Sequence, residues 1–510
     1  MSSSSVKSDD SSGAGAITPS PFELIQRSRH SFFGISSISD LYRFIFPKRT
    51  PTKKLVLDTT DAVAVVFFMA VGMMSRVFRI QFPQTVVFDE VHFGNFTNWY
   101  IRGQYFHDIH PPLSKLIMAG VAKAAGYKAE YNFAKIEPTS KYPSMIFVAL
   151  RLTPAFFGAL CVPLSYLIMR VMNARHFAAA IAAFMVMFDC MLIVEARHIL
   201  SDGILHFFSC LAILSIFLHE RYYTLFTFMF EGFCLGCVAS CKYTSGGIVL
   251  LAFIRQFDIT SITSLFKKNN LRNLTSSAIR CCILTFIVII IHITCFWIHL
   301  TILPYEPENR VDMPECVRKG LVNMKNPNWR QRANAPSMLY RIISLIIYMH
   351  RGNMRIGHRH PYSSPWYTWP LATGKWLLFW TNEGKHIICM GNVLLWWPVF
   401  FSIVINLIRS LLLFDFQSEE SSMLFGYLLS YMPFMLIPRD VFIYHYAIPL
   451  LFGIYNLNLL IERWLPPVCR GYCYLLFVSM AAFGYVKWNP WAYGLTTPDF
   501  YFLVWNRKWP

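Results

Sequence analysis

Charged residues are scarce in this chain of 510 residues. Asp, Glu, Lys and Arg together make up 15% of it, while 55% is hydrophobic and 16% is aromatic. Soluble globular domains carry about 25% charged residues, so this composition excludes that class and predicts a polytopic membrane protein. Acids are the scarcest, at 28 against 46 basic residues. The basic residues lie on connectors between apolar runs, which fits contact with membrane lipids and predicts no nucleic-acid partner.

Three further features are missing. The first residues lack the short apolar core of a cleavable signal peptide, so we expect residues 1–57 to be an uncleaved, partly disordered cytoplasmic tail. Nearly all of the thirteen cysteines lie inside apolar runs, which predicts membrane packing rather than a disulfide scaffold. The chain also shows no spacing of ligand residues typical of a metal site, so the sequence predicts neither metal nor cofactor.

Long apolar runs predict an all-α fold of about eleven membrane-spanning helices. The spans are expected at about 59–78, 113–126, 145–170, 177–194, 199–218, 224–254, 281–302, 386–408, 423–437, 441–462 and 469–486. Basic residues before the first span place the amino terminus in the cytosol. Spans one to seven then fall in 58–302 and spans eight to eleven in 385–488. Alternation places the loop 79–112, the stretch 303–384 and the tail 489–510 in the lumen.

Charged residues inside predicted spans need a partner. Arg76, near the end of the first span, either reaches the membrane surface or pairs with the acids that follow, and we expect the second. Arg151 in the third span has either a helix-end or a functional position. The sixth span is interrupted at 242–247, beginning with Lys242. A broken helix of this kind lines protein interior or an aqueous cavity.

The stretch from Phe88 to Leu113 places two adjacent acids, Asp89 and Glu90, at a membrane boundary. A carboxylate near lipid has a substantial desolvation cost, so acids beside a span are more often functional than acids in a soluble loop. The alternative is that Asp89 caps a short helix that begins at Glu90. A second polar group, Asp108 with His110, precedes the turn back into the membrane.

These residues resemble a known family. The segments FDEVHFG at 88–94 and DIHPPLSKL at 108–116 are similar to the first lumenal loop of the dolichyl-phosphate-mannose protein O-mannosyltransferases. Three later segments resemble family motifs in the family order. They are Gly236 to Tyr243 with Ser240-Cys-Lys242, His358-Arg-His360-Pro-Tyr-Ser-Ser-Pro-Trp366 with Trp369-Pro370, and Ile437-Pro-Arg439-Asp-Val-Phe-Ile-Tyr444-His445-Tyr446. The first of these has Tyr243 where the family usually has Trp.

The resemblance departs from the family in one region. Family members commonly carry a lumenal domain of three β-trefoil-like repeats, the MIR domain, between the seventh and eighth spans. Here that interval, 303–384, has only about eighty residues, and its first part, 303–340, shows no repeat. The chain therefore resembles a compact member without MIR. This departure affects the expectation for acceptor binding more than that for the chemistry.

The resemblance implies a GT-C-type fold in the endoplasmic reticulum membrane and transfer of mannose, with inversion, from dolichyl phosphate mannose to Ser or Thr hydroxyls of proteins. Asp89 would be the base, Glu90 would position the acceptor peptide, and Asp108 and His110 would orient the loop or the sugar. The other candidate substrate-binding residues are Arg76, Arg151, Lys242, His358, His360, Arg439, Tyr444 and His445. Among these, Arg439, helped by Lys242, His358 and His360, would neutralise the phosphate. The resemblance also implies a homodimer or a heterodimer with another family member.

Alternatives remain at this point. Arg439 has a structural alternative, pairing with Asp440, and His358 and His360 have one in fixing the turn around Pro361. A transferase of the same fold that acts on a lipid or glycan acceptor would carry similar motifs. A secondary transporter also uses broken helices and intramembrane arginines, although transporters usually show related halves and this chain shows no internal repeat.

Overall fold

The computed structural model describes residues 37–47, 55–137, 139–257, 268–308, 311–323, 335–355, 360–497 and 500–509. Most of them are helical. The helices are α2 (Ile38–Ile45), α3 (Thr59–Val77), α4 (Glu90–Arg102), α5 (Leu113–Ala124), α6 (Phe147–Val171), α7 (His176–Met187), α8 (Cys190–Ala196), α9 (Asp202–Tyr222), α10 (Leu225–Ala239), α11 (Gly246–Gln256), α13 (Lys268–Ile302), α14 (Glu315–Arg318), α15 (Met338–Arg355), α16 (Val393–Leu413), α17 (Glu419–Tyr431), α18 (Ala447–Trp464), α19 (Pro467–Tyr493) and α20 (Phe500–Leu503).

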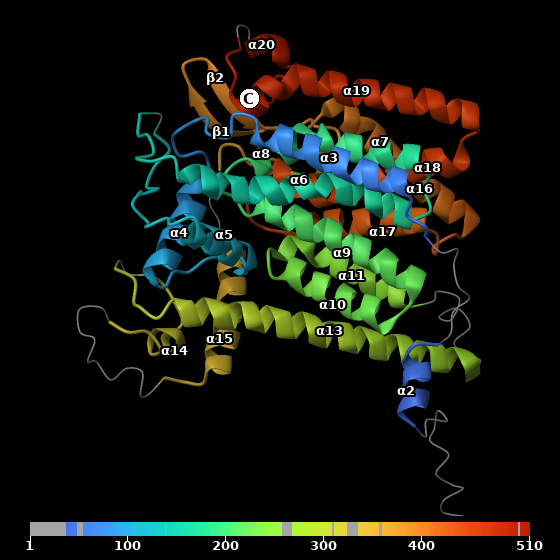
Figure 1. Cartoon of the computed structure of the whole chain (residues 1–510), viewed down its shortest axis with the longest axis horizontal. Helices are drawn as coiled ribbons and strands as arrows, with labels where there is room; N and C mark the ends of the chain where they lie inside the picture. Colours follow the sequence, from blue (N-terminus) through green and yellow to red (C-terminus); the bar gives the residue numbers. More distant parts are fainter. Residues whose placement is uncertain are drawn as a thin grey trace, which may run out of the picture.

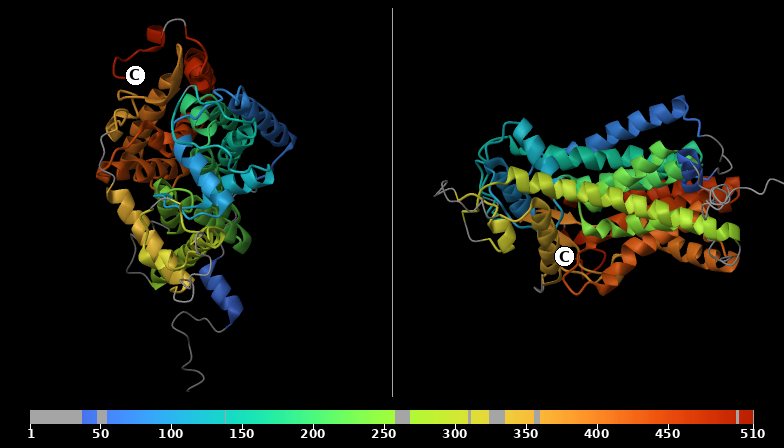
Figure 2. Two further views of the ribbon diagram at one scale, coloured as in Figure 1. Left: turned by 90° about the vertical axis from the view of Figure 1, so that its left-hand side faces the viewer. Right: turned by 90° about the horizontal axis from the view of Figure 1, so that it is seen from below.

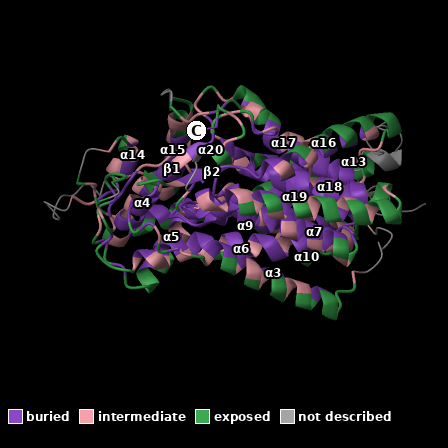
Figure 3. Ribbon diagram, turned by 90° about the horizontal axis from the view of Figure 1, so that it is seen from above, coloured by how far each residue is buried: buried purple, intermediate pink, exposed green. Residues whose placement is uncertain are grey.

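The long helices run side by side and form one elongated bundle (Figures 1 and 2). Helix α6 packs against α3, α7 and α9. Buried residues concentrate in the middle of the bundle, whereas α3 and α19 carry many exposed residues (Figure 3). Exposed apolar side chains on outer helices are expected where lipid replaces water as the solvent. Helices α4, α5, α14 and α15 gather at one end of the bundle, and α2 lies at the other (Figure 1).

The predicted number of spans exceeds what helix length and hydropathy support. In the described part of the chain, six helices are long and apolar enough to cross a membrane, namely α3, α6, α9, α13, α16 and α19. A seventh results if α7 and α8 count as one span, bent by 59° where Asp189 caps α8. The remaining helices at predicted spans are shorter or less apolar. Eleven spans and the division into cytosolic and lumenal segments therefore stay predictions.

The interruption predicted in the sixth span is confirmed. Helix α10 ends at Ala239 and α11 begins at Gly246, with the short 3-10 turn Tyr243–Ser245 between them. Serine side chains also bond to the backbone on both sides of the break. Ser240 Oγ donates to the Gly236 carbonyl at 2.7 Å, and Ser245 Oγ donates to the Lys242 carbonyl at 2.8 Å. The break is therefore a built feature that places Lys242 at the end of the bundle where α4 and α5 lie.

One β-hairpin interrupts the otherwise helical chain, and the sequence analysis missed it. Strands β1 (Leu377–Asn382) and β2 (Lys385–Cys389) pair antiparallel around a turn at Glu383 and Gly384, both with positive φ. The prediction that the eighth span starts at about 386 is therefore wrong, because that helix, α16, begins at Val393. Strand and helix follow each other within one apolar run, which hydrophobic periodicity alone does not divide.

Candidate functional site

Segments that are far apart in the sequence meet at the end of the bundle that carries α4 and α5. The Phe88 backbone N–H donates to the Phe379 carbonyl on β1 at 3.1 Å, and the Phe88 ring lies 6.5 Å from the Tyr444 ring. The Ser364 N–H donates to the Val441 carbonyl at 3.0 Å. The first loop, the β-hairpin, the His-Pro-Tyr segment (360–370) and the Pro-Arg segment (437–446) therefore meet at this end of the bundle.

Asp89 stands at the first turn of α4 without acting as its cap. Its side chain makes no capping hydrogen bond, and no hydrogen bond or ion pair connects its carboxylate to another described residue. Burial raises the pKa of Asp89 to about 6, with Asp202 and Asp108 acting in the same direction and His92 and Lys242 opposing it. A carboxylate with this pKa is free to accept a proton near neutral pH.

Glu90 points the other way, into the bundle. Its carboxylate is completely buried and forms a two-point ion pair with Arg151, at 2.7 Å from Nε and 2.8 Å from Nη2. Tyr142 Oη donates to it at 2.9 Å, and the backbone N–H groups of Val87 and Ile199 donate at 2.9 and 3.0 Å. With these partners in place, the geometry gives Glu90 no free position for a substrate.

Arg151 completes this arrangement. Besides Glu90, its guanidinium donates to the carbonyl groups of Ile80, Pro83 and Thr85, at 2.7 to 3.2 Å. It is fully buried in α6. Arg151 thus fixes the chain leading up to Phe88 through its carbonyls and the start of α4 through Glu90. The two residues anchor the loop that carries Asp89.

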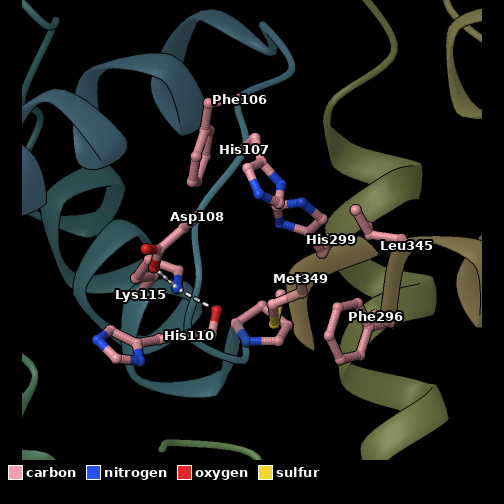
Figure 4. Close-up of a pocket in the computed structure, with 10 residues that line it drawn as sticks. Phe106, His107, Asp108, His110, Lys115, Phe296, His299, Leu345 and Met349 are labelled. Atoms are coloured by element: carbon pink, nitrogen blue, oxygen red, sulfur yellow. Dashed lines mark hydrogen bonds and ion pairs between the residues drawn. The ribbon is translucent and has the colours of Figure 1, made fainter. Parts of the chain in front are cut away.

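Asp108 and His110 line a small recess between the first loop, the end of α13 and α15 (Figure 4). Lys115 Nζ forms an ion pair with Asp108 and donates to the His110 carbonyl at 2.8 Å. Although burial opposes it, the Lys115 ammonium holds the pKa of Asp108 below its usual range. Burial lowers the pKa of His110 to about 3, so its imidazole is neutral at physiological pH. The pair therefore offers a fixed anion and a neutral ring, which suits positioning rather than proton abstraction.

Lys242 lies at the break between α10 and α11, close to Asp89. Its Nζ donates to Asp202 Oδ1 at 2.8 Å and lies 5.1 Å from the centroid of the Tyr444 ring. Both charged side chains are buried. The Tyr444 ring stacks on His445 with centroids 4.5 Å apart, and His445 Nδ1 bonds to the backbone of Phe442. A single cation is thereby held against an aromatic face next to the acid.

Arg439 is the least constrained cation of the site. It is half-buried, and no hydrogen bond or ion pair joins it to another residue that the structure describes. The alternative of an ion pair with Asp440 is not adopted, because Asp440 Oδ2 accepts the His360 N–H at 2.5 Å instead. The His360 ring accepts the Tyr362 N–H at 3.2 Å, which is the turn-fixing alternative. His358 lies outside the described residues.

The prediction for Arg76 is wrong. Its guanidinium is buried and donates to Ser75 Oγ at 2.8 Å and to the carbonyl groups of Met187 and Val186 at 2.9 and 3.0 Å. These carbonyls lie at the end of α7, where the bend before α8 frees them from helical hydrogen bonds. Arg76 therefore serves the bend rather than the acidic loop.

Three residues of the site were not assigned from the sequence. Lys115 was quoted within the DIHPPLSKL segment without a role, and its position seven residues after Asp108 was the available signal. Asp202 falls inside the predicted span 199–218, and its only signal was a carboxylate within an apolar run. Tyr142, the hydroxyl partner of Glu90, stands in a polar connector with no motif around it.

Two groups of side chains have the residue types and spacing of a cation site. They are Asp58, Asp61 and His176 at the start of α3 and α7, and Glu195, Asp202 and His206 between α8 and α9. In the first group Arg170 Nε donates to Asp61 at 2.7 Å, and in the second Lys242 donates to Asp202. In each group a basic side chain of the protein therefore already forms an ion pair with one carboxylate. The expectation that the chain needs no metal stays a prediction.

Two family models match the chain. The model described as dolichyl-phosphate-mannose-protein mannosyltransferase matches residues 66–304, and the model described as the C-terminal four TMM region of protein-O-mannosyltransferase matches residues 338–509. The first carries Asp89, Asp108 and Lys242 of the site described above, and the second carries Arg439 and Tyr444. Together they cover both sides of the site.

Individual relatives agree with this. The chain is 36% identical over 191 residues to dolichyl-phosphate-mannose--protein mannosyltransferase 4 of Schizosaccharomyces pombe, which is 36% of this chain and 24% of the relative. It is 30% identical over 263 residues to protein O-mannosyl-transferase 1 of Danio rerio, which is 49% of this chain and 36% of the relative. The chain thus matches about a quarter to a third of the length of these relatives.

A solved structure shares the fold. The Saccharomyces cerevisiae protein O-mannosyltransferase Pmt1-Pmt2 complex bound to the sugar donor superposes with a TM-score of 0.76 and 18% identity, covering 92% of this chain and 94% of that one. Likeness at this identity establishes the GT-C-type fold, and the two family models establish descent. The chain belongs to the family of dolichyl-phosphate-mannose-protein mannosyltransferases.

Proposed function

We propose that this chain transfers mannose, with inversion, from dolichyl phosphate mannose to Ser or Thr hydroxyls of proteins at the lumenal face of the endoplasmic reticulum membrane. The observation that carries this is that Asp89, a carboxylate without a hydrogen-bond partner among the described residues, and Lys242, a cation fixed by Asp202, lie on the face where the family motifs meet. The names of the relatives support the same donor and acceptor class.

The chemistry needs two groups on opposite sides of the sugar. Inversion in one displacement requires a base that takes the proton of the attacking hydroxyl and positive charge that stabilises the leaving phosphate. Asp89 fits the first task because its pKa is about 6 and nothing in the described residues occupies its oxygens. Lys242 and Arg439 fit the second. Asp108 and His110 would contact the sugar or hold the loop.

Glu90 takes a different role in this proposal from the one expected from the sequence. Its carboxylate is saturated by Arg151, Tyr142 and two backbone N–H groups. We assign it, with Arg151, to holding Asp89 in place rather than to binding the acceptor peptide. Acceptor binding then falls to other groups around the recess beside Asp108.

Assembly and orientation extend the proposal. The Saccharomyces cerevisiae neighbour is a complex of two related chains, which supports a homodimer or a heterodimer with another family member here. Basic residues ahead of α3 support a cytosolic amino terminus and, by alternation, a lumenal carboxyl-terminal segment. The motif-bearing loops would then face the lumen.

The proposal is tested by mannose transfer from dolichyl phosphate mannose to a Ser/Thr-rich peptide, using the purified chain with and without a chelator. We expect transfer that survives chelation, because Lys242 and Arg439 supply the positive charge. A parallel reaction with lipid and glycan acceptors separates the protein substrate from the same-fold alternative. Movement of the donor across vesicles without transfer would instead indicate a transporter.

The pH dependence of transfer follows from Asp89. Its pKa of about 6 means that the carboxylate is ionised above that pH and protonated below it. Because only the ionised form accepts the hydroxyl proton, we expect kcat/KM to be level at neutral pH and to fall about tenfold per pH unit below about pH 6. Rates measured between about pH 4.5 and 8 test this. A profile that stays flat down to about pH 5 would contradict the assignment of the base.

Substitution of Arg439 tests the phosphate side. Arg439→Gln removes a half-buried cation that has no partner among the described residues. We expect weaker donor binding by about tenfold, the loss of one charge-assisted contact, with unchanged thermal stability. Donor titration by fluorescence and a thermal melt measure the two. Arg318→Gln, which replaces another half-buried cation that lies outside the site, is the matched control. Donor affinity equal to the wild type would remove Arg439 from the phosphate site.

A further inference from the structure

A layer of buried side chains at the junction of α8 and α9 contacts Lys242 through Asp202. The sequence Glu195-Ala-Arg-His-Ile-Leu-Ser-Asp202 ends α8 and begins α9, and His206 follows one turn later. Glu195, Asp202 and His206 are all buried, and one ligand atom from each lies within 4.8 Å of the others. Of these three residues, Asp202 contacts the site described above, because it accepts a hydrogen bond from Lys242.

Glu195 and His206 form a closed pair within this layer. Their side chains approach to 3.5 Å, between Oε2 and Nε2, and no described residue gives either Glu195 oxygen a hydrogen bond. An ionised carboxylate without partners in a protein interior costs several kcal/mol. Asp202 is therefore the carboxylate of this layer that a cation stabilises, because it accepts from Lys242 Nζ.

Asp202 acts on two groups at once. Its Oδ1 accepts from Lys242 Nζ at 2.8 Å and holds the ammonium over the Tyr444 ring. The titratable groups that interact with Asp89 come from five places: His92 on α4, Lys242 at the break after α10, Asp202 at the start of α9, Asp108 before α5, and Tyr444 before α18. Of these, Lys242 favours the ionised form of Asp89 and Asp202 disfavours it.

We propose that Asp202 is a positioning residue for the transfer reaction: it fixes Lys242 next to the reacting centre and offsets the ammonium charge so that Asp89 remains basic enough to take the hydroxyl proton. Without Asp202, Lys242 is attracted to Asp89 itself, which would weaken the base and withdraw the ammonium from the phosphate. The inference rests on the proposed function, since it assigns a role within the same site.

The charges predict shifts of opposite sign. In Asp202→Asn the like charge near Asp89 is removed, so the pKa of Asp89 falls. The acidic limb of the profile, which is the fall of kcat/KM below about pH 6, then moves by about one pH unit to lower pH. In Lys242→Gln the opposite charge is removed, and the limb moves by a similar amount to higher pH. The double variant removes both charges, and its limb returns toward that of the wild type. General damage to the fold does not produce shifts of opposite sign.

The experiment measures the acidic limb for the wild type, Asp202→Asn, Lys242→Gln and the double variant. Glu231→Gln is the matched control, because Glu231 is an equally buried carboxylate on α10 whose partner is Gln256 rather than any residue of the site. We expect it to keep the limb of the wild type. At saturating donor, Asp202→Asn should also lower kcat by about tenfold, since a weaker base accepts the proton less readily.

The outcomes separate this inference from the function on which it rests. A wild-type chain that transfers no mannose would overturn the proposed function, and the present assignment with it. An active chain in which Asp202→Asn leaves the limb in place, or moves it in the same direction as Lys242→Gln, would overturn only the role of Asp202. If Asp202→Asn does not fold, the double variant decides, because removing both partners of a buried ion pair is often tolerated: a limb displaced upward as far as in Lys242→Gln alone would exclude an effect of Asp202.

Discussion

Replacing Asp89 by Asn should lower mannose transfer by about a hundredfold or more while leaving the protein folded, because a positioned base contributes on that scale. The amide has nearly the same shape as the carboxylate and cannot accept the hydroxyl proton. No described residue bonds to the carboxylate oxygens of Asp89, so the substitution breaks no side-chain contact among the described residues. The rate is measured with purified protein, dolichyl phosphate mannose and a Ser/Thr peptide.

The control for this experiment is Glu315→Gln. Glu315 lies in α14 and is exposed, and among the described residues its carboxylate forms an ion pair with Arg318 across 3.8 Å. We expect it to transfer mannose at the rate of the wild type. Asp89→Asn protein that elutes as a single species and still transfers at a similar rate would show that another group takes the proton.

Replacing Arg151 by Met should reduce the free energy of unfolding by about 3 to 5 kcal/mol, the cost of leaving a buried charge without its partner. Glu90 would lose both guanidinium contacts, and the carbonyl groups of Ile80, Pro83 and Thr85 would lose their donors. All of these groups are inaccessible to water. The expected result is a much lower melting temperature in detergent, with activity lost as the loop before Asp89 loosens.

Two comparisons isolate the ion pair. Arg439→Met removes a half-buried arginine that has no partner among the described residues, so its melting temperature should match that of the wild type. Arg151→Met combined with Glu90→Gln removes both charges and should recover part of the lost stability. An Arg151→Met protein as stable as the wild type would mean that the carboxylate of Glu90 finds another cation or takes up a proton at little cost.

The sequence predicted the features that depend on the type of a residue and on its neighbours in the chain. Adjacent acids beside a span, a polar interruption at Lys242, and motifs in family order were sufficient to place Asp89, Lys242 and Arg439 on one face. Some helices follow their apolar runs closely, for example Thr59–Val77 against the predicted 59–78, whereas α13 begins at Lys268 where the prediction was about 281. Composition and periodicity depend only on local chain properties, and these are local features.

The direction in which each side chain points was not predictable in the same way. Asp89 and Glu90 are neighbours, yet one faces the site and the other faces Arg151, because successive residues at a helix start point about 100° apart and only the surrounding fold decides which way each turns. The prediction for Arg76 failed for a related reason. Its partners are backbone carbonyls at the bend around Phe188, and the sequence did not predict that bend.

The hydrogen bond between Phe88 and Phe379 also sets an order of assembly. Almost three hundred residues separate the two, and at 5 to 20 residues per second a ribosome needs about 15 to 60 seconds to make them. Arg151 follows Glu90 by only 61 residues and can bind it within seconds of emerging. During synthesis Arg151 can therefore bind Glu90 and anchor the acidic loop long before Phe379, which contacts the same loop through Phe88, has been made. A chain stalled between these points would carry an anchored Asp89 and an incomplete site, so the proposed catalytic centre is one of the last parts of the molecule to form.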